Sequence, residues 1–147
     1  MQKIVIGSDR IGFQLKASLL EGLVDRGFVV EDVGPHEERS VHYPVIAKMV
    51  ARMIAGGRGD RVGVLICSTG IGMSIAANRV KGARAANCST VYLAERSRAH
   101  NDANILVLGS RILDTAQALR IVDAFMSTSF EGGKHAGRVR MLDDDEP

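Results

Sequence analysis

The stretch Val62-Gly63-Val64-Leu65-Ile66, continued by Cys67-Ser68-Thr69-Gly70-Ile71-Gly72-Met73-Ser74, decides the expected fold of this chain. Residues 62–66 are almost wholly apolar, which predicts a strand covered on both faces, as in a parallel sheet. The glycines that follow predict a loop that runs into a helix ending near Asn78. A buried strand joined to a helix in this way is typical of an α/β fold.

Strands alternate with helices on both sides of this stretch. The other expected strands span residues 3–7, 28–33, 83–86 and 105–109, and the other expected helices span residues 13–26, 45–54, 91–100 and 115–126. With right-handed crossovers, this alternation predicts a single-domain α/β fold, a Rossmann-like three-layer sandwich with a five-stranded parallel sheet. The domain is expected to span residues 1–142, and the acidic residues 143–147 are expected to form a solvated, disordered tail.

The composition excludes several classes of protein. The chain has 147 residues, the length of one ordinary domain, and 46% of them are hydrophobic. Aromatic residues make up only 4%, so the core must be aliphatic and stacking platforms for single-stranded nucleic acid are few. The net charge of +2 is too small to indicate a nucleic-acid or membrane partner. With two cysteines and no apolar run near about 18 residues, the chain is expected to be cytoplasmic.

Ligands of such sheets bind outside the carboxyl ends of the strands, so the residues after each strand are the candidates for chemistry. The loop of Cys67 combines a thiol at a strand end with two glycines, which bring backbone amides close to a ligand. Amides at the start of a helix stabilise a thiolate and a nearby oxyanion. The alternative is an inert buried cysteine, which is common for free thiols.

Three known kinds of ligand-binding loop do not fit residues 67–75. A cysteine phosphatase needs an arginine six residues after the cysteine, where Met73 stands. A Walker loop needs Gly-Lys-Ser or Gly-Lys-Thr, which these residues do not contain. A dinucleotide fingerprint needs a third glycine where Ile75 stands, and it belongs after the first strand.

Two polar pairs elsewhere are further candidates. Asp9 and Arg10 follow the first strand and could bind sugar hydroxyls and an anion, although Asp9 could equally cap the next helix. His100 and Asn101 offer proton transfer or, alternatively, the cap of a helix end.

Basic residues in the C-terminal half form the last candidate. Lys134 and Arg138 are four residues apart, which places them on one face if this segment is helical. Together with Arg111, which follows the fifth strand, they could clamp a phosphate. A solvated basic face is the alternative.

Taken together, these segments resemble the ribose-5-phosphate isomerase B family, which also includes the galactose-6-phosphate isomerase subunits. The resemblance implies an aldose–ketose isomerase that acts on a phosphorylated sugar without a metal or an organic cofactor. It also implies a homodimer, or a dimer of dimers, with the active site at the subunit interface. The matching stretches occur in family order over residues 3–141 and are Gly7-Ser8-Asp9, Gly12-Phe13 with Leu15-Lys16, Tyr43-Pro44, residues 67–72, Ile75-Ala76-Ala77-Asn78, Arg84-Ala85, residues 97–104, Gly109-Ser110-Arg111 and residues 131–135.

The resemblance further implies a role for each site residue. Cys67 resembles the base that moves a proton between C1 and C2, and Thr69 and His100 resemble the groups that open the sugar ring. The residues implied to hold the rest of the substrate, including the enediolate oxygen, are Asp9, Arg10, Tyr43, Ser68, Gly70, Ile71, Gly72 and Asn101. Those implied to bind the phosphate are Arg111, Lys134 and Arg138.

Three residues around the substrate depart from the family pattern. Arg10 stands where many members have histidine, His42 where aspartate is frequent, and Lys134 where arginine is common. The expected reaction is the conversion of ribose 5-phosphate to ribulose 5-phosphate in the pentose phosphate pathway. Allose 6-phosphate, galactose 6-phosphate or a tetrose phosphate are alternative substrates. The alternative from another class is a non-catalytic, flavodoxin-like binding module, which would not need Cys67, His100 and the basic residues together.

Overall fold

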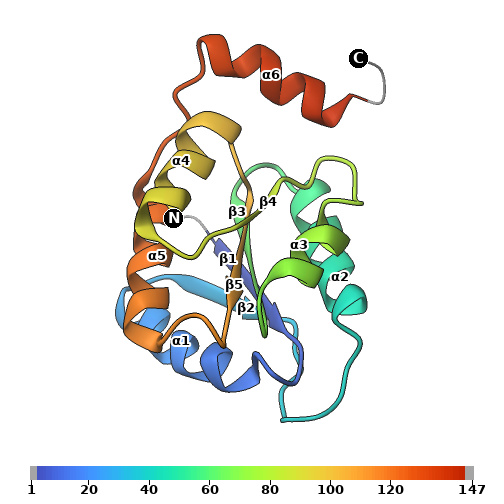
Figure 1. The fold of residues 1–147 in the computed structure, drawn as a ribbon, viewed down its shortest axis with the longest axis vertical. Coiled ribbons are helices and arrows are strands. Elements are labelled where there is room, and N and C mark those ends of the chain that lie inside the picture. The colour runs from blue at the N-terminus through green and yellow to red at the C-terminus, as the bar shows by residue number, and fades with distance from the viewer. Residues whose placement is uncertain (1–2, 145–147) are drawn as a thin grey trace.

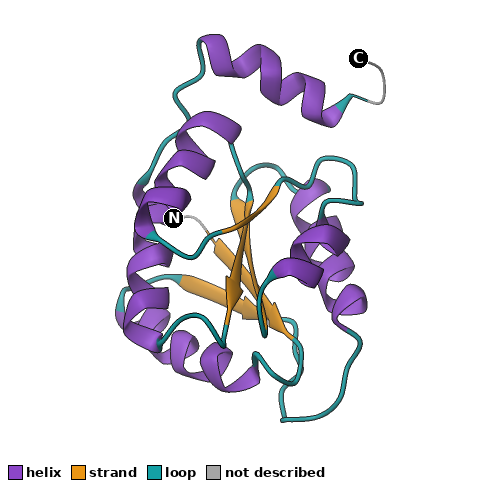
Figure 2. Cartoon of the chain, in the orientation of Figure 1, coloured by secondary structure: helices purple, strands orange, loops and turns teal. Residues whose placement is uncertain are grey.

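A parallel sheet of five strands lies between two layers of helices, as Figure 1 and Figure 2 show. The computed structural model describes residues 3–144. The strands are β1 (Lys3–Ser8), β2 (Val29–Asp32), β3 (Arg61–Cys67), β4 (Ala85–Asn87) and β5 (Ile105–Gly109). The helices are α1 (Phe13–Asp25), α2 (Tyr43–Ala55), α3 (Ile71–Ala77), α4 (Val91–Asn101), α5 (Thr115–Ser127) and α6 (Lys134–Asp143).

The strand order in the sheet is β2-β1-β3-β5-β4, and every neighbouring pair is parallel. The expected Rossmann-like α/β sandwich is therefore confirmed, with small shifts at the ends of the elements. Among residues 3–144, each helix falls short of the combined length and hydrophobicity that crossing a lipid bilayer requires.

Helix α6 is an element that the sequence does not predict on its own. Gly132 and Gly133 precede it, both with positive φ, and Gly137 lies within it. Val139 alone of the α6 residues is buried. The helix therefore lacks the apolar periodicity from which the other helices are predicted.

The end of α6 includes the first of the residues expected to form an acidic tail. Asp143 is the last residue of the helix and Asp144 is its C-cap, while residues 145–147 lie outside the described residues. Arg84 Nη1 donates to Asp143 Oδ2 at 2.8 Å. This ion pair links the end of α6 to the segment that precedes β4.

The two faces of the sheet bury separate aliphatic clusters. Successive residues of a strand point to opposite faces, so Val64 and Ile66 pack with α1 and α5, whereas Leu65 and Cys67 pack with α2 and α3. The central strand β3 is thus buried on both sides, as its apolar run predicts. The side chain of Cys67 lies on the α2 and α3 side of the sheet.

The strand order brings three loops together at the carboxyl edge of the sheet. β3 lies between β1 and β5, and the helix after β3 covers one face of the sheet while the helices after β1 and β5 cover the other. Ligands of open α/β sheets bind where neighbouring connections diverge in this way. The N–H of Asp9, after β1, donates to Ile66 O at 3.2 Å, and the N–H of Ser110, after β5, donates to Cys67 O at 2.8 Å. The loops after β1 and β5 are therefore fastened to the end of β3.

A buried lysine fastens the segment between β2 and α2. Lys16, on α1, is 1% exposed, and its Nζ donates to Asp32 Oδ1 at 2.7 Å and to Pro35 O at 2.6 Å. Asp32 Oδ1 also accepts the N–H of Gly34 at 2.9 Å. A buried ammonium persists only when it is paired and hydrogen-bonded. Lys16 therefore holds the start of the segment that leads to Tyr43.

Replacing Lys16 by methionine is expected to lower the free energy of unfolding by about 3 kcal/mol, because the mostly buried Asp32 carboxylate loses its cation. Urea unfolding at one fixed protein concentration measures this loss. Replacing Asp32 by asparagine in the same chain should recover part of it, since a neutral amide does not need the ammonium. Wild-type stability in the single variant would contradict the role given to this ion pair.

Candidate active site

The loop after β3 wraps around the sulfur of Cys67. Gly70 has a φ of 83°, in the left-handed region, and this conformation turns the chain into α3. The N–H of Gly70 donates to Cys67 Sγ at 3.2 Å. Cys67 is a free thiol and is 5% exposed. An N–H aimed at the sulfur interacts more strongly with a charged acceptor than with a neutral one.

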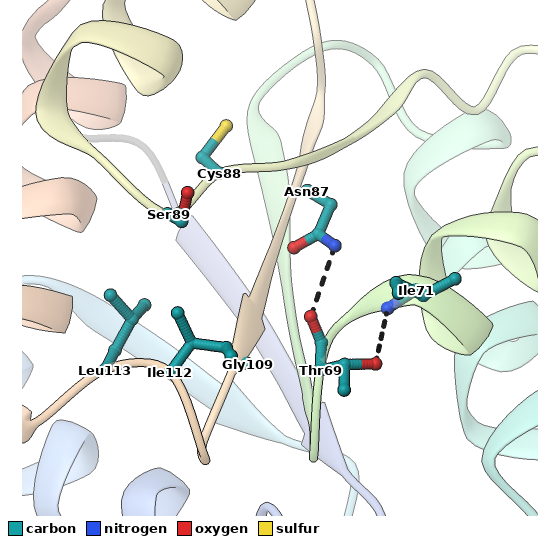
Figure 3. Close-up of a pocket in the computed structure, with 8 residues that line it drawn as sticks. All are labelled: Thr69, Ile71, Asn87, Cys88, Ser89, Gly109, Ile112 and Leu113. Carbon is teal, nitrogen blue, oxygen red and sulfur yellow. Dashed lines mark hydrogen bonds between the residues drawn. The ribbon is translucent and has the colours of Figure 1, made fainter.

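A cavity of about 290 Å³ opens beside this loop, and Figure 3 shows the residues that line it. Thr69 Oγ1 accepts the N–H of Ile71 at 3.3 Å, and Asn87 Nδ2 donates to Thr69 O at 3.2 Å. Ile112, after β5, lines the cavity together with these three residues. Sequence reasoning missed Asn87, because it ends the short strand β4 and has no motif around it.

Cys88 lines the same cavity but belongs to the core. Its Sγ lies 3.9 Å from Ser97 Oγ of α4, and it is 2% exposed. Burial raises the pKa of the Cys88 thiol, and the hydrogen bond to Ser97 opposes that shift. A thiol in this environment stays neutral at neutral pH.

Two glycines let neighbouring segments approach the Cys67 loop. A Cβ at Gly72 would lie 2.8 Å from the ring of Tyr43, the first residue of α2. A Cβ at Gly12 would lie 2.5 Å from Ile66 O, at the end of β3. Asp9 Oδ1 accepts the N–H of Gly12 at 2.8 Å. The Asp9 carboxylate therefore shapes the turn before α1, but the N-cap of α1 is Gly12 and no side chain caps this helix, so the alternative of Asp9 as its cap is wrong.

One group of predicted site residues is thus assembled at the carboxyl edge, from the loops after β1, β3 and β5 and the start of α2. The N–H of Arg111 donates to Ser68 O at 3.0 Å, which places the loop after β5 against the loop after β3. The members of this carboxyl-edge group are Asp9, Arg10, Tyr43, Cys67, Ser68, Thr69, Gly70, Ile71, Gly72 and Arg111.

The other predicted residues lie at the opposite end of the same chain. α4 follows β4, so it starts at the carboxyl edge and runs back to the amino edge. Its eleven residues span about 16 Å. Figure 1 shows the end of α4 next to α6, far from the loops after β3 and β5. We refer to His100, Asn101, Lys134 and Arg138 as the α4–α6 group. A single chain does not bring the two groups together.

His100 of the α4–α6 group stacks on a second histidine, His135 of α6. The ring centroids of His100 and His135 are 4.3 Å apart and the planes differ by 11°. Glu131 Oε2 lies 3.7 Å from His100 Nε2 and 3.6 Å from His135 Nε2. Partial burial lowers the pKa of His135, and the charges of His100, Lys134 and Arg138 lower it further, while Glu131 raises it.

Sequence reasoning did not assign a role to Glu131 or His135, although both lie in a stretch that matches the family. One ring nitrogen of His100, one of His135 and a carboxylate oxygen of Glu131 lie within 4.8 Å of one another, a spacing that could hold a metal ion. Two imidazoles and one carboxylate are ligands that zinc accepts. The positive charges of Arg96, Lys134 and Arg138 surround this cluster and oppose the binding of a cation. We therefore assign no metal to it.

The fold is a Rossmann-like sandwich, and its carboxyl edge carries a thiol, backbone amides and basic side chains. These are the features of an enzyme that acts on a small anionic molecule. Residues 4–142 match the protein family described as Ribose/Galactose Isomerase. The chain is 46% identical over 142 residues to ribose-5-phosphate isomerase B of Escherichia coli strain K12. The aligned region covers 97% of this chain and 95% of that relative.

Two further relatives extend the comparison. The chain is 38% identical over 144 residues to D-erythrulose-4-phosphate isomerase of Pectobacterium atrosepticum, covering 97% of this chain and 93% of that one. It is 37% identical to ribose-5-phosphate isomerase B of Mycoplasma genitalium, solved with bound ribulose 5-phosphate, with a TM-score of 0.92 and coverage of 96% and 93%. This chain belongs to the ribose/galactose isomerase family. The family and the isomerase class expected from the sequence are both confirmed.

Replacing Gly70 by alanine is expected to lower the isomerisation rate at least roughly tenfold, because the new Cβ would meet the Asn87 amide and displace the N–H that faces Cys67. Gly27 has a φ of 80° and nothing within 4 Å of the position that a Cβ would take, so Gly27→Ala carries similar backbone strain without a collision. Both variants should lose about 1 kcal/mol of stability to that strain. Equal activity in the two variants would contradict the placement of the amide.

Proposed function

We propose that this chain interconverts ribose 5-phosphate and ribulose 5-phosphate by moving a proton between C1 and C2. The Cys67 thiolate takes the proton from C2 of the open-chain aldose, and the electron pair forms a C1–C2 double bond. The carbonyl oxygen at C1 becomes the enediolate oxyanion. Return of the proton to C1, with transfer of the O2 proton to O1, gives the ketose. The observation that carries this proposal is the Cys67 sulfur, held at a strand end with the Gly70 amide 3.2 Å away.

The backbone amides of residues 68–72 stabilise the enediolate in this proposal. Charge that develops during proton abstraction must meet donors that are already in place. The left-handed turn at Gly70 directs the chain into α3, and the absence of a side chain at Gly72 lets the ring of Tyr43 pack against this loop. The proton transfer uses protein groups alone, without a metal or an organic cofactor.

The remaining site residues bind and open the sugar in the same proposal. Thr69 and His100 open the ring, and Asp9, Tyr43 and Asn101 bind hydroxyl groups. Phosphate contacts distant from the reacting carbons supply binding energy for positioning. The residues proposed to bind the phosphate are Arg111, Lys134 and Arg138, and Arg10 is a further substrate-binding residue; all four have exposed side chains.

We propose that the complete site forms between two copies of the chain, in a homodimer or a dimer of dimers. A two-fold axis would place the α4–α6 group of each copy against the carboxyl-edge group of the other, forming two equal sites. Large apolar side chains near the carboxyl edge support this, because exposed apolar patches mark interaction surfaces. They are between 43% and 66% exposed and comprise Ile71, Ile75, Tyr92, Leu93 and Ile112.

We further propose that the protein works in the cytoplasm, in the pentose phosphate pathway. Cys67 and Cys88 are both free thiols, which is typical of a reducing compartment. Interconversion of ribose 5-phosphate and ribulose 5-phosphate is a reaction of that pathway.

A different aldose phosphate is the second candidate substrate. Arg10, His42 and Lys134 depart from the family pattern around the substrate, and all three are exposed. The relative from Pectobacterium atrosepticum is named for a four-carbon sugar phosphate. A longer, forked guanidinium at position 10 could bind the phosphate of a shorter sugar.

Incubation of the purified protein with ribose 5-phosphate in heavy water tests the proposal. Proton NMR should detect ribulose 5-phosphate and deuterium at the carbon that receives the proton. The same assay with erythrose 4-phosphate, allose 6-phosphate and galactose 6-phosphate ranks the substrates. A faster rate with one of these would favour the second candidate. Neither conversion nor deuterium incorporation with any of them would refute the isomerase proposal.

A further inference from the structure

We propose that Glu131 and His135 are positioning residues, which hold the imidazole of His100 in the orientation that opens the sugar ring. This inference rests on the proposed function, in which His100 takes part in ring opening. Neither residue needs to touch the sugar, because both act through the ring of His100. The contacts among Glu131, His135 and His100 all lie within one chain.

Glu131 is held beside His100 through its backbone. The N–H of Glu131 donates to Ala99 O at 3.0 Å, which ties the segment before α6 to the last turn of α4. From this position, Glu131 Oε2 lies 3.7 Å from His100 Nε2. Arg96 Nη1 lies 3.5 Å from the same nitrogen. The carboxylate therefore supplies the negative charge next to an imidazole that otherwise faces a guanidinium.

His135 fixes the plane of the His100 ring. The two rings are nearly parallel, with centroids 4.3 Å apart, and the His135 side chain is only 12% exposed. The N–H of His135 donates to Gly132 O at 3.0 Å in the first turn of α6. Its Nε2 is 3.6 Å from the same oxygen of Glu131. The His100 side chain is 36% exposed, so its ring would be free to turn without these neighbours.

The chemistry of the two sugars separates ring opening from proton transfer. Ribose 5-phosphate closes a furanose ring through O4. Opening it breaks the C1–O4 bond, moves a proton from the anomeric hydroxyl to a base, and gives O4 a proton from His100. Ribulose 5-phosphate has its carbonyl at C2, and a furanose would need O5, which carries the phosphate. The ketose is therefore already open, and exchange of its C1 hydrogen does not require His100 to be positioned.

The test compares forward conversion of ribose 5-phosphate with deuterium exchange at C1 of ribulose 5-phosphate. In Glu131→Gln, kcat for forward conversion should fall roughly 10- to 100-fold with an unchanged KM, while C1 exchange stays at the wild-type rate. Glu131→Asp should regain part of the forward rate. His135→Ala should show the same split, whereas His135→Phe, which keeps a flat ring against His100, should retain most of the forward rate.

Glu21→Gln on α1 removes an exposed carboxylate as a matched control and should change neither rate. Equal losses of conversion and exchange in Glu131→Gln, or no loss of either, would overturn the inference. Because Glu131 is 53% exposed, this variant is expected to fold, and thermal melting of every variant checks that the fold is intact. Absence of both signals in the wild-type protein would instead refute the proposed function.

Discussion

Replacement of Cys67 by serine is expected to lower kcat by roughly 10³- to 10⁴-fold, because a hydroxyl is a much weaker base than a thiolate at neutral pH. The substitution is close to isosteric, so the loop and the N–H of Gly70 should stay in place. Steady-state kinetics with ribose 5-phosphate measures the loss. Binding of a non-reactive phosphate ligand, measured by calorimetry, should be unchanged, because the proposed phosphate contacts come from other residues.

Cys88→Ala is the matched control for the removal of a thiol. The Cys88 sulfur is buried next to Ser97 of α4 and lies in the core, so its loss should reduce stability without a comparable loss of activity. Near-normal turnover by Cys67→Ser would remove Cys67 from the role of base. A loss of phosphate binding in the same variant would show that the substitution damages the whole carboxyl edge.

Mixing two inactive variants is expected to restore activity if each site takes residues from two chains. Cys67→Ser inactivates the carboxyl-edge group, and His100→Asn inactivates the α4–α6 group. In a mixed dimer, one site combines both intact groups and the other combines both defective ones. Random pairing makes half of the dimers mixed, so the preparation should regain about a quarter of wild-type activity. Co-expression of the two variants and a rate assay measure this recovery.

Co-expression of Cys67→Ser with Thr69→Ala is the control, because both defects lie in the carboxyl-edge group. No pairing of these chains creates an intact site, so activity should stay at the level of the single variants. Absence of recovery in the Cys67→Ser and His100→Asn mixture would mean that the two groups do not meet between chains.

The carboxyl-edge group could be predicted because its residues follow strands that are apparent in the sequence. The apolar run before Cys67 indicates a strand buried on both faces, and the topology of a parallel sheet then places the loops after β1, β3 and β5 at one edge. The opposite placement of His100 follows from the same topology, since a crossover helix begins and ends at opposite edges.

Other parts of the site depend on contacts between distant segments and could not be predicted. The backbone of Glu131 bonds to Ala99 and so places Glu131 beside His100, and a single sequence carries no signal for such a pairing. Asn87 reaches Thr69 from the edge strand β4, which has three residues. The sequence does not predict α6, because its glycine and its charged residues interrupt the apolar pattern of a helix.

The separation of the two groups along one chain has a consequence for gene duplication. After a duplication, one copy could lose its thiol while the other loses its imidazole, and a mixed assembly would still retain one competent centre. Selection would then preserve both diverged copies as the two subunits of an obligate hetero-oligomer, because each copy alone would be inactive. With the site formed between chains as proposed, such a pair of genes would need no new chemistry to evolve from an ancestor arranged like this chain.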